Sequence, residues 1–181
     1  MSLERIWAGW RSEYVESATD PTAGSDAATG AGGPEPCVMC RLADADESME
    51  AAHVLWRGSL TAAALNAYPY TSGHLMVMPR RHVADLESLE AEESAQLWSA
   101  VTTAVVAVKA AYRPEGINVG INLGRAAGAG IPGHLHVHVL PRWAGDSNFM
   151  TSVAEARVMP ETLSRSAERL RAAWSGPAPT L

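Results

Sequence analysis

The stretch from Gly133 to Trp143, GHLHVHVLPRW, holds three of the six histidines of the chain. Successive side chains of a β-strand point to opposite faces, so a strand would place the three histidines on one face and an apolar row on the other. The histidines are His134, His136 and His138, and the apolar residues are Leu135, Val137 and Val139. A helix would scatter the imidazoles around its surface. Because imidazoles are costly to bury without partners, the histidine face is expected to line a polar site.

Composition limits the class of protein. Apolar residues make up 47% of the 181 residues, which suits one globular domain with a sizeable core. The formal net charge of −6 argues against a nucleic-acid partner, which requires a basic surface. No apolar run is long enough for a membrane span and no signal-peptide pattern opens the chain, so we expect a cytoplasmic protein without a membrane partner.

The chain divides into three parts. Residues 1–16 contain the amphipathic stretch ERIWAGWRSEYV, which predicts an N-terminal docking segment. Residues 17–36 are rich in Gly, Ala, Pro, Ser and Thr without an apolar period, which predicts a flexible insert. Residues 37–181 then form the main domain.

The pattern within the main domain favours strands mixed with a few helices. We expect strands at residues 53–56, 60–65, 75–79, 117–124 and in the histidine stretch, and helices at residues 88–112 and 161–173. This order predicts an α+β fold with an antiparallel sheet of about five strands, one long helix and a C-terminal helix.

The chain has two cysteines, Cys37 and Cys40, separated by two residues. In a reducing compartment this spacing favours metal or redox chemistry over a structural disulfide. A tetrahedral metal site needs two more ligands, and His53, His74 and His82 are candidates outside the histidine stretch. The spacing alone leaves both a metal site and a pair of packed thiols open.

Three interpretations of the histidine row remain open. The imidazoles could bind a catalytic metal, form a structural polar network, or provide a nucleophile with two supporting rings. Metallohydrolases usually add carboxylates, and no acidic residue occurs between Glu115 and Asp146. The loop from Asn122 to Gly133 is rich in glycine and contains Arg125, a composition that suits an anion such as phosphate as well as a simple turn.

The histidine stretch resembles the signature of the histidine triad (HIT) family, in which three histidines alternate with apolar residues. SGHLMVMPRRH at residues 72–82 resembles a second conserved block, and LNAYPY before it resembles the nucleoside-contacting strand. IWAGWRSEY and PRWAGDSNFM resemble the branch that includes bacterial diadenosine tetraphosphate phosphorylases. The resemblance covers residues 6–159 apart from the insert.

This resemblance implies a nucleotidyltransferase that splits dinucleoside polyphosphates through a covalent nucleotidyl-histidine. By analogy, His136 is the nucleophile, His138 binds the α-phosphate oxygens and His74 helps to position the rings. The residues that are expected to contact the nucleotide are Asn66, Asn122, Ala129, Gly130 and His138. Asn66 stands where the family usually binds ribose with an Asp, and an amide grips two hydroxyls less strongly than a carboxylate.

The resemblance also implies a metal and a partner. In zinc-bearing members, two cysteines and two histidines hold a structural zinc ion, and the matching residues are Cys37, Cys40, His82 and His134. The family implies a homodimer in which the sheets of two copies join across the two-fold axis, with the long helix near that interface.

The segment AGAGIPG departs from the hydrolase-type pattern, because it lacks a Gln and a hydroxyl before the triad. We therefore expect inorganic phosphate rather than water as the acceptor, with backbone N–H groups of Ala129 and Gly130 replacing the missing side chains. The alternatives are a hydrolase of dinucleoside polyphosphates or nucleoside phosphoramidates, a nucleotide-binding sensor without turnover, and a metalloenzyme that uses all three histidines as ligands. His53 belongs to no motif, and we expect it on the surface or on an edge strand.

Overall fold

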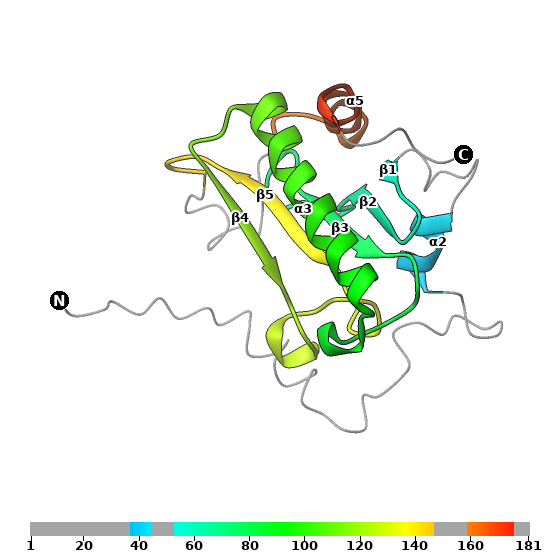
Figure 1. Cartoon of the computed structure of the whole chain (residues 1–181). Coiled ribbons are helices and arrows are strands. Elements are labelled where there is room, and N and C mark those ends of the chain that lie inside the picture. The colour runs from blue at the N-terminus through cyan, green and yellow to red at the C-terminus, as the bar shows by residue number, and fades with distance from the viewer. Residues whose placement is uncertain (1–36, 45–52, 147–158, 176–181) are drawn as a thin grey trace.

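The computed structural model describes residues 37–44, 53–146 and 159–175 (Figure 1). The predicted docking segment at residues 1–16 and the flexible insert at residues 17–36 lie outside these ranges. Five strands form one antiparallel sheet in the order β1-β2-β3-β5-β4. The strands are β1 (Val54–Arg57), β2 (Thr61–Leu65), β3 (Leu75–Pro79), β4 (Gly116–Ile121) and β5 (Val137–Arg142). The predicted α+β fold with a five-stranded antiparallel sheet is confirmed.

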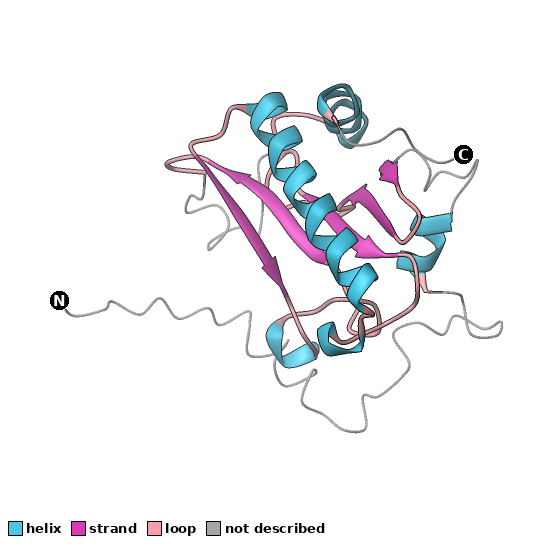
Figure 2. Cartoon of the chain, viewed as in Figure 1, coloured by secondary structure: helices cyan, strands magenta, loops and turns pink. Residues whose placement is uncertain are grey.

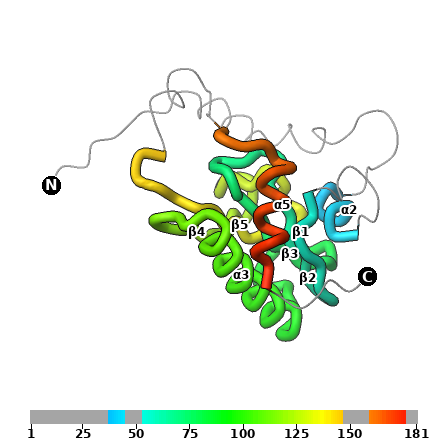
Figure 3. Tube along the Cα trace, turned by 90° about the horizontal axis from the view of Figure 1, so that it is seen from above, coloured from blue at the N-terminus to red at the C-terminus, as the bar shows by residue number. Residues whose placement is uncertain are grey.

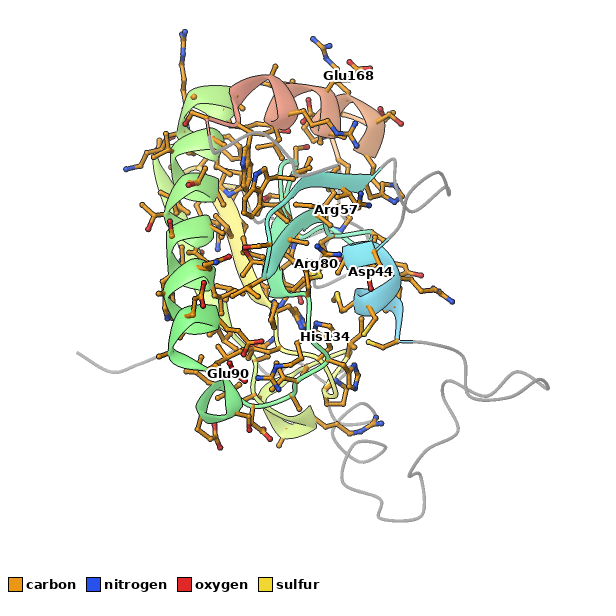
Figure 4. All side chains as sticks on the ribbon, turned by 45° about the vertical axis from the view of Figure 1, so that its right-hand side comes forward. Asp44, Arg57, Arg80, Glu90, His134 and Glu168 are labelled. Carbon is orange, nitrogen blue, oxygen red and sulfur yellow. The ribbon has the colours of Figure 1, made fainter. Side chains whose placement is uncertain are left out.

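In the described ranges, three α-helices cover the two faces of the sheet. The long helix α3 (Ala91–Tyr112) and the C-terminal helix α5 (Leu163–Ala173) pack on one face, while α2 (Val38–Asp44) packs on the other (Figure 4). Seen from above, α5 lies beside α3 near the β1 edge (Figure 3). Both helices were predicted, but α2 was not. Within the described ranges, no helix is both long enough and apolar enough to cross a membrane.

Alternation along the strands separates two cores. Side chains of β2 and β3 that face α3 join one buried cluster, and their neighbours along each strand join a second cluster under α2. The α3 side includes Ala63, Leu65, Leu75 and Val77, and the α2 side includes Ala62, Ala64, Met76 and Met78. Because both faces of these strands are covered, β2 and β3 are buried along their full length.

The apolar row of the histidine stretch packs against α3 as predicted. Leu135, Val137 and Val139 are at most 2% exposed and belong to the cluster that contains α3. The strand itself begins at Val137, three residues after His134, the first of the three histidines. The reason is that the Leu135 N–H donates to the carbonyl of Val83, at 2.7 Å, rather than to a neighbouring strand. His134 and His136 therefore lie just before β5.

An ion pair fixes the loop between β3 and α3. Arg81 donates to both carboxylate oxygens of Glu93, at 2.8 and 2.6 Å, and Glu93 also accepts from the N–H of Glu90 at the start of α3, at 2.9 Å. This loop and the β4–β5 loop lie at the same end of the sheet (Figure 2). The ion pair thus holds the residue after Arg81, His82, close to the histidine stretch.

Candidate active site

A cavity of about 380 Å³ lies between α2 and the sheet. Its apolar wall comes from α2, from β2 and β3, and from the glycine-rich loop. These residues are Val38, Met39, Leu42, Leu65, Met76 and Ile131. The lining also includes the polar side chains of His53, Asn66, His136 and His138 and the tyrosines Tyr68 and Tyr70. The cavity therefore offers an apolar surface with an imidazole pair beside it, which suits an organic group joined to a charged one.

A backbone carbonyl fixes the tautomer of His136. The Nδ1 atom of this ring lies 2.8 Å from the carbonyl oxygen of His134, and a carbonyl oxygen only accepts. Nδ1 must therefore carry the proton in the neutral ring, which leaves the lone pair on Nε2. The ring is only 5% exposed and lines the cavity. His136 thus has the proton arrangement of a nucleophile.

A second chain of hydrogen bonds orients His138. The Tyr70 N–H donates to Nδ1 of His74 at 3.1 Å, so the proton of the neutral His74 ring is on Nε2. This Nε2 lies 2.9 Å from Nδ1 of His138 and donates to it. The neutral His138 ring then carries its own proton on Nε2. Within the described residues nothing accepts from this Nε2, so His138 can donate to an anion in the cavity, next to the His136 ring, whose centroid is 4.9 Å away.

A glycine makes room for the turn that delivers His74. Gly73 has a φ of +80°, and a Cβ atom there would lie 2.5 Å from the Tyr112 ring. Both the backbone conformation and the close approach require glycine. His74 is consequently held with no exposed surface behind the other two rings.

Burial keeps the supporting imidazoles neutral. Burial, reinforced by the nearby His136 ring, lowers the pKa of His138 to about 4. Burial also lowers the pKa of His134. Both rings are uncharged near neutral pH, which agrees with the tautomers that the hydrogen bonds impose.

The predicted nucleotide-contacting residues lie around the cavity in different ways. Asn66 lines it, and its Oδ1 accepts from the Tyr68 N–H at 2.9 Å. Gly130 lines it as well, whereas the Ala129 N–H donates to Gly124 at 3.3 Å and so serves the loop itself. Asn122 donates to the carbonyl of Gly128, at 3.3 Å, and braces the loop from behind.

The four predicted metal ligands form one cluster beside the cavity. The ligand atoms of Cys37, Cys40, His82 and His134 all lie within 4.8 Å of one another. In the view of Figure 4, His134 is seen between α3 and α2. These residues come from the start of α2, from the β3–α3 loop and from the segment before β5. The cluster can hold a metal ion.

The geometry of this cluster fits a tetrahedral ion. Nε2 of His134 donates to the carbonyl of Pro79 at 2.9 Å, so the lone pair is on Nδ1, which faces both sulfur atoms at 3.5 and 3.6 Å. The Cys40 sulfur lies 3.3 Å from Nδ1 of His82. Tetrahedral bond lengths for zinc require an S···N separation of about 3.6 Å. Burial, followed by the neighbouring Cys37 sulfur, raises the pKa of the Cys40 thiol, a cost that a bound cation would remove.

A family model for the HIT domain matches residues 48–145, more than half of the 181 residues. The chain belongs to the HIT family. It is 39% identical to AP-4-A phosphorylase of Mycobacterium tuberculosis over 176 residues, which cover 96% of this chain and 85% of that protein. It is 34% identical to the asymmetrical bis(5'-nucleosyl)-tetraphosphatase of Schizosaccharomyces pombe over 93 residues, 51% of this chain and 50% of that protein. The predicted membership of the HIT family is confirmed.

Solved structures agree with this assignment. A zinc-bound histidine triad family protein from Mycobacterium smegmatis matches with a TM-score of 0.62 and 29% identity, over 77% of this chain and 93% of that chain. A hypothetical histidine triad nucleotide-binding protein from Sulfolobus tokodaii also matches with a TM-score of 0.62, at 26% identity, over 76% of this chain and 91% of that chain. The sheet and helices described above are the HIT fold.

The structure adds cavity residues that no motif marked. His53 lies directly before the edge strand β1, one of the two expected locations, but it is half-buried and lines the cavity, because the start of β1 lies beside α2. Val38, Met39 and Leu42 also line the cavity. Three apolar positions within a helix of seven residues are too short a signal to identify from sequence.

Acid should destabilise the metal-free protein in the range of histidine titration. In the unfolded chain these rings bind protons near pH 6.5, whereas folded His138 does so only near 4 and the pKa of His134 is also lowered. The unfolding free energy should therefore fall as the pH is lowered from 6.5 to 5. The fall should be less than about 1.4 kcal/mol per pH unit for each ring, and smaller still for His138, whose ring is partly exposed to screening by solvent. Urea unfolding at each pH measures this change.

The variant His138→Asn provides the control for that titration. It should show a shallower dependence over the same interval, because one of the two buried rings is gone. Unfolding free energies that stay constant between pH 6.5 and 5 would contradict the neutral state of these rings.

Proposed function

We propose that this protein is a nucleotidyltransferase that cleaves diadenosine tetraphosphate with inorganic phosphate, through a covalent intermediate on His136. The observation that carries this proposal is the fixed tautomer of His136, which directs a lone pair into a cavity beside the donor on His138. The similarity to AP-4-A phosphorylase over 96% of the chain supports the choice of substrate.

The first step forms one bond and breaks one. Nε2 of His136 attacks the α-phosphorus, and the bond from this phosphorus to the oxygen that bridges to the β-phosphate breaks. ATP leaves, and AMP remains joined to Nε2. The ring becomes positively charged, and its Nδ1–H donates to the His134 carbonyl, which stabilises that charge. Nε2 of His138 donates to an α-phosphate oxygen, and His74 holds His138 in place.

The second step returns the enzyme to its starting state. An oxygen of inorganic phosphate attacks the same phosphorus, the P–N bond breaks, and ADP leaves while the proton of the phosphate passes to solvent. Asn66 is assigned to bind the ribose, and the backbone of Gly130, with the neighbouring Ala129, is assigned to the phosphates. Asn122 is assigned to support the glycine-rich loop through its hydrogen bond to Gly128. The segment AGAGIPG, residues 127–133 of the loop, has no polar side chain to orient a water molecule, which favours phosphate as the acceptor.

Hydrolysis is the second candidate, because the chain also resembles a tetraphosphatase over about half of its length. A water molecule would then attack the same intermediate and release AMP in place of ADP. The two functions share His136 and differ only in the acceptor.

Product analysis decides between these candidates. With diadenosine tetraphosphate and inorganic phosphate, we expect ADP and ATP in equal amounts, measured by anion-exchange chromatography. His136→Ala should lower kcat by at least about a thousandfold, because the covalent route is lost. Thr102→Ala, on the exposed side of α3, is the control and should leave kcat unchanged. If the wild-type protein yields AMP and ATP, it is a hydrolase and not a phosphorylase. A fully active His136→Ala variant would refute both functions.

We infer that the ion at the cluster of Cys37, Cys40, His82 and His134 is zinc. Two thiolates and two imidazoles are the donor set that zinc prefers in closed structural sites, and a zinc-bound relative has the same fold. When bound, the ion ties α2 to the sheet. A reducing compartment such as the cytoplasm would keep both thiols available, and both are free in this structure.

Zinc should stabilise the chelator-treated protein. At a free zinc concentration about a thousandfold above its Kd, the unfolding free energy should rise by about 4 kcal/mol, which thermal unfolding detects as a higher Tm. Cys40→Ser should abolish most of this rise, and Mg²⁺ should produce none because it prefers oxygen ligands. A Tm that zinc leaves unchanged would contradict the site.

We infer a homodimer that forms through β4. Within the described residues β4 pairs only with β5, so its outer edge presents free backbone groups. Val119 on β4 is 42% exposed, on the same face as Ile117 and Ile121, which pack against the α3 cluster, and Val106 on α3 is 48% exposed. These exposed apolar side chains support an interface that joins the two sheets.

Light scattering tests this assembly. The mass in solution should be about twice 19.2 kDa, and Val119→Lys should reduce it toward the monomer because two like charges would meet at the new edge. Val119→Thr, which keeps the shape without the charge, should remain dimeric. A monomeric wild-type protein would contradict the interface.

A further inference from the structure

The wall of the cavity contains an imidazole to which no motif assigns a role. His53 lies directly before β1 and lines the same cavity as His136 and His138. In residues 37–44, 53–146 and 159–175, no hydrogen-bond, ion-pair or ring partner contacts the His53 ring. A half-buried imidazole with one donor and one acceptor unused is available to a ligand.

Three other polar side chains of this wall each have one contact within the protein. Asn66 accepts from Tyr68, His136 donates to the His134 carbonyl, and His138 accepts from His74. The part of the wall that α2 supplies is apolar and consists of Val38, Met39 and Leu42. His53 is therefore placed to supply a directional contact beside these apolar side chains.

The register of the sheet gives the direction of the bound nucleotide. Val54 pairs with Ala64, Ala64 with Met76, and Met76 with His138, so these four residues form one row across the sheet. With neighbouring strands about 4.8 Å apart, the row spans roughly 14 Å. If the phosphate is at His138, the sugar and base extend along the row over Met76 toward the β1 end. The base then lies next to His53.

The backbone beside His53 is held firmly. Nε and Nη2 of Arg171, on α5, both donate to the Val54 carbonyl, at 3.0 and 2.7 Å. The pairing of β1 with β2 also shifts register between Val54 and Trp56, and such bulges redirect side chains next to binding sites. A contact made by His53 would thus be made from a rigid support.

We propose that His53 determines the preference of this enzyme for purine nucleotides, by donating a ring N–H to N7 of the base. The proposal rests on the nucleotide-binding function given above. N7 is an acceptor in both adenine and guanine, and pyrimidines have no matching atom. The role is that of a specificity-determining residue, because His53 contacts the base and not the reacting phosphorus.

A ligand that differs from the natural one by a single atom tests this contact. The zinc-loaded protein and its His53→Ala variant are titrated with adenosine monophosphate and with its 7-deaza analogue, in which carbon replaces N7. Wild-type protein should bind adenosine monophosphate about three- to tenfold more tightly than the analogue, as expected for one hydrogen bond. His53→Ala should bind both equally. Equal affinities in the wild type, or an undiminished difference in the variant, would overturn the proposal.

Two further variants separate the hydrogen bond from shape and stability. His53→Gln keeps a donor and should retain part of the preference, whereas His53→Phe keeps a ring without a donor and should lose it. Thr102→Ala, remote on α3, should behave as wild type. A preference that His53→Phe retains would assign the effect to packing and refute the hydrogen bond.

Turnover distinguishes a failure of this proposal from a failure of the proposed function. For diadenosine tetraphosphate, His53→Ala should raise KM with kcat nearly unchanged, because the contact is the same in the ground state and the transition state. A wild-type protein that binds both monophosphates with the expected difference but does not turn over the tetraphosphate would refute the enzyme and leave the His53 contact standing. A wild-type protein that turns over the tetraphosphate but binds both monophosphates equally would refute only the contact.

Discussion

The burial of Leu135, Val137 and Val139 against α3 fixes the direction of every histidine in the same segment. These three side chains are at most 2% exposed, and moving the segment by one residue would expose them while burying imidazoles in the apolar core. The hydrophobic effect on one side of the sheet therefore sets the chemistry on the other side. Glu93 and Arg81 act in the same direction, because their ion pair holds the adjoining loop and His82 close to this segment.

Backbone groups then give each imidazole a separate role. Carbonyl oxygens accept from Nδ1 of His136 and from Nε2 of His134, so one ring directs Nε2 into the cavity and the other directs Nδ1 toward the two sulfur atoms. In His74 the Tyr70 N–H donates to Nδ1, which puts the proton of that ring on Nε2. His74 then donates to Nδ1 of His138, so the proton of His138 is also on Nε2. Rings of the same chemical type thus become suited to a nucleophile, a ligand and a donor because their backbone partners differ.

The sequence allowed the fold and the family to be predicted because the signals were long or periodic. The alternation in the histidine stretch and the apolar stripe of α3 identify a strand and a helix, and both are confirmed. Helix α2 was not predicted, because seven residues are too few to show a clear helical periodicity and because its helical form depends on packing against the sheet. The position of His53 in the cavity wall was not predicted, because it depends on a bulge and on Arg171, which is more than 100 residues away. The roles of the individual site residues stay predictions.

Helix α2 connects two sites that the chain keeps apart in sequence. Cys40 belongs to the metal cluster, while Val38, Met39 and Leu42 form one wall of the cavity. A helix of seven residues is not stable alone, so whatever orders it at one site also prepares it for the other. If the ion raises the affinity for the nucleotide, thermodynamic reciprocity requires that the nucleotide raise the affinity for the ion by the same factor. A cell short of the ion would then have an enzyme with an empty metal site and weaker nucleotide binding.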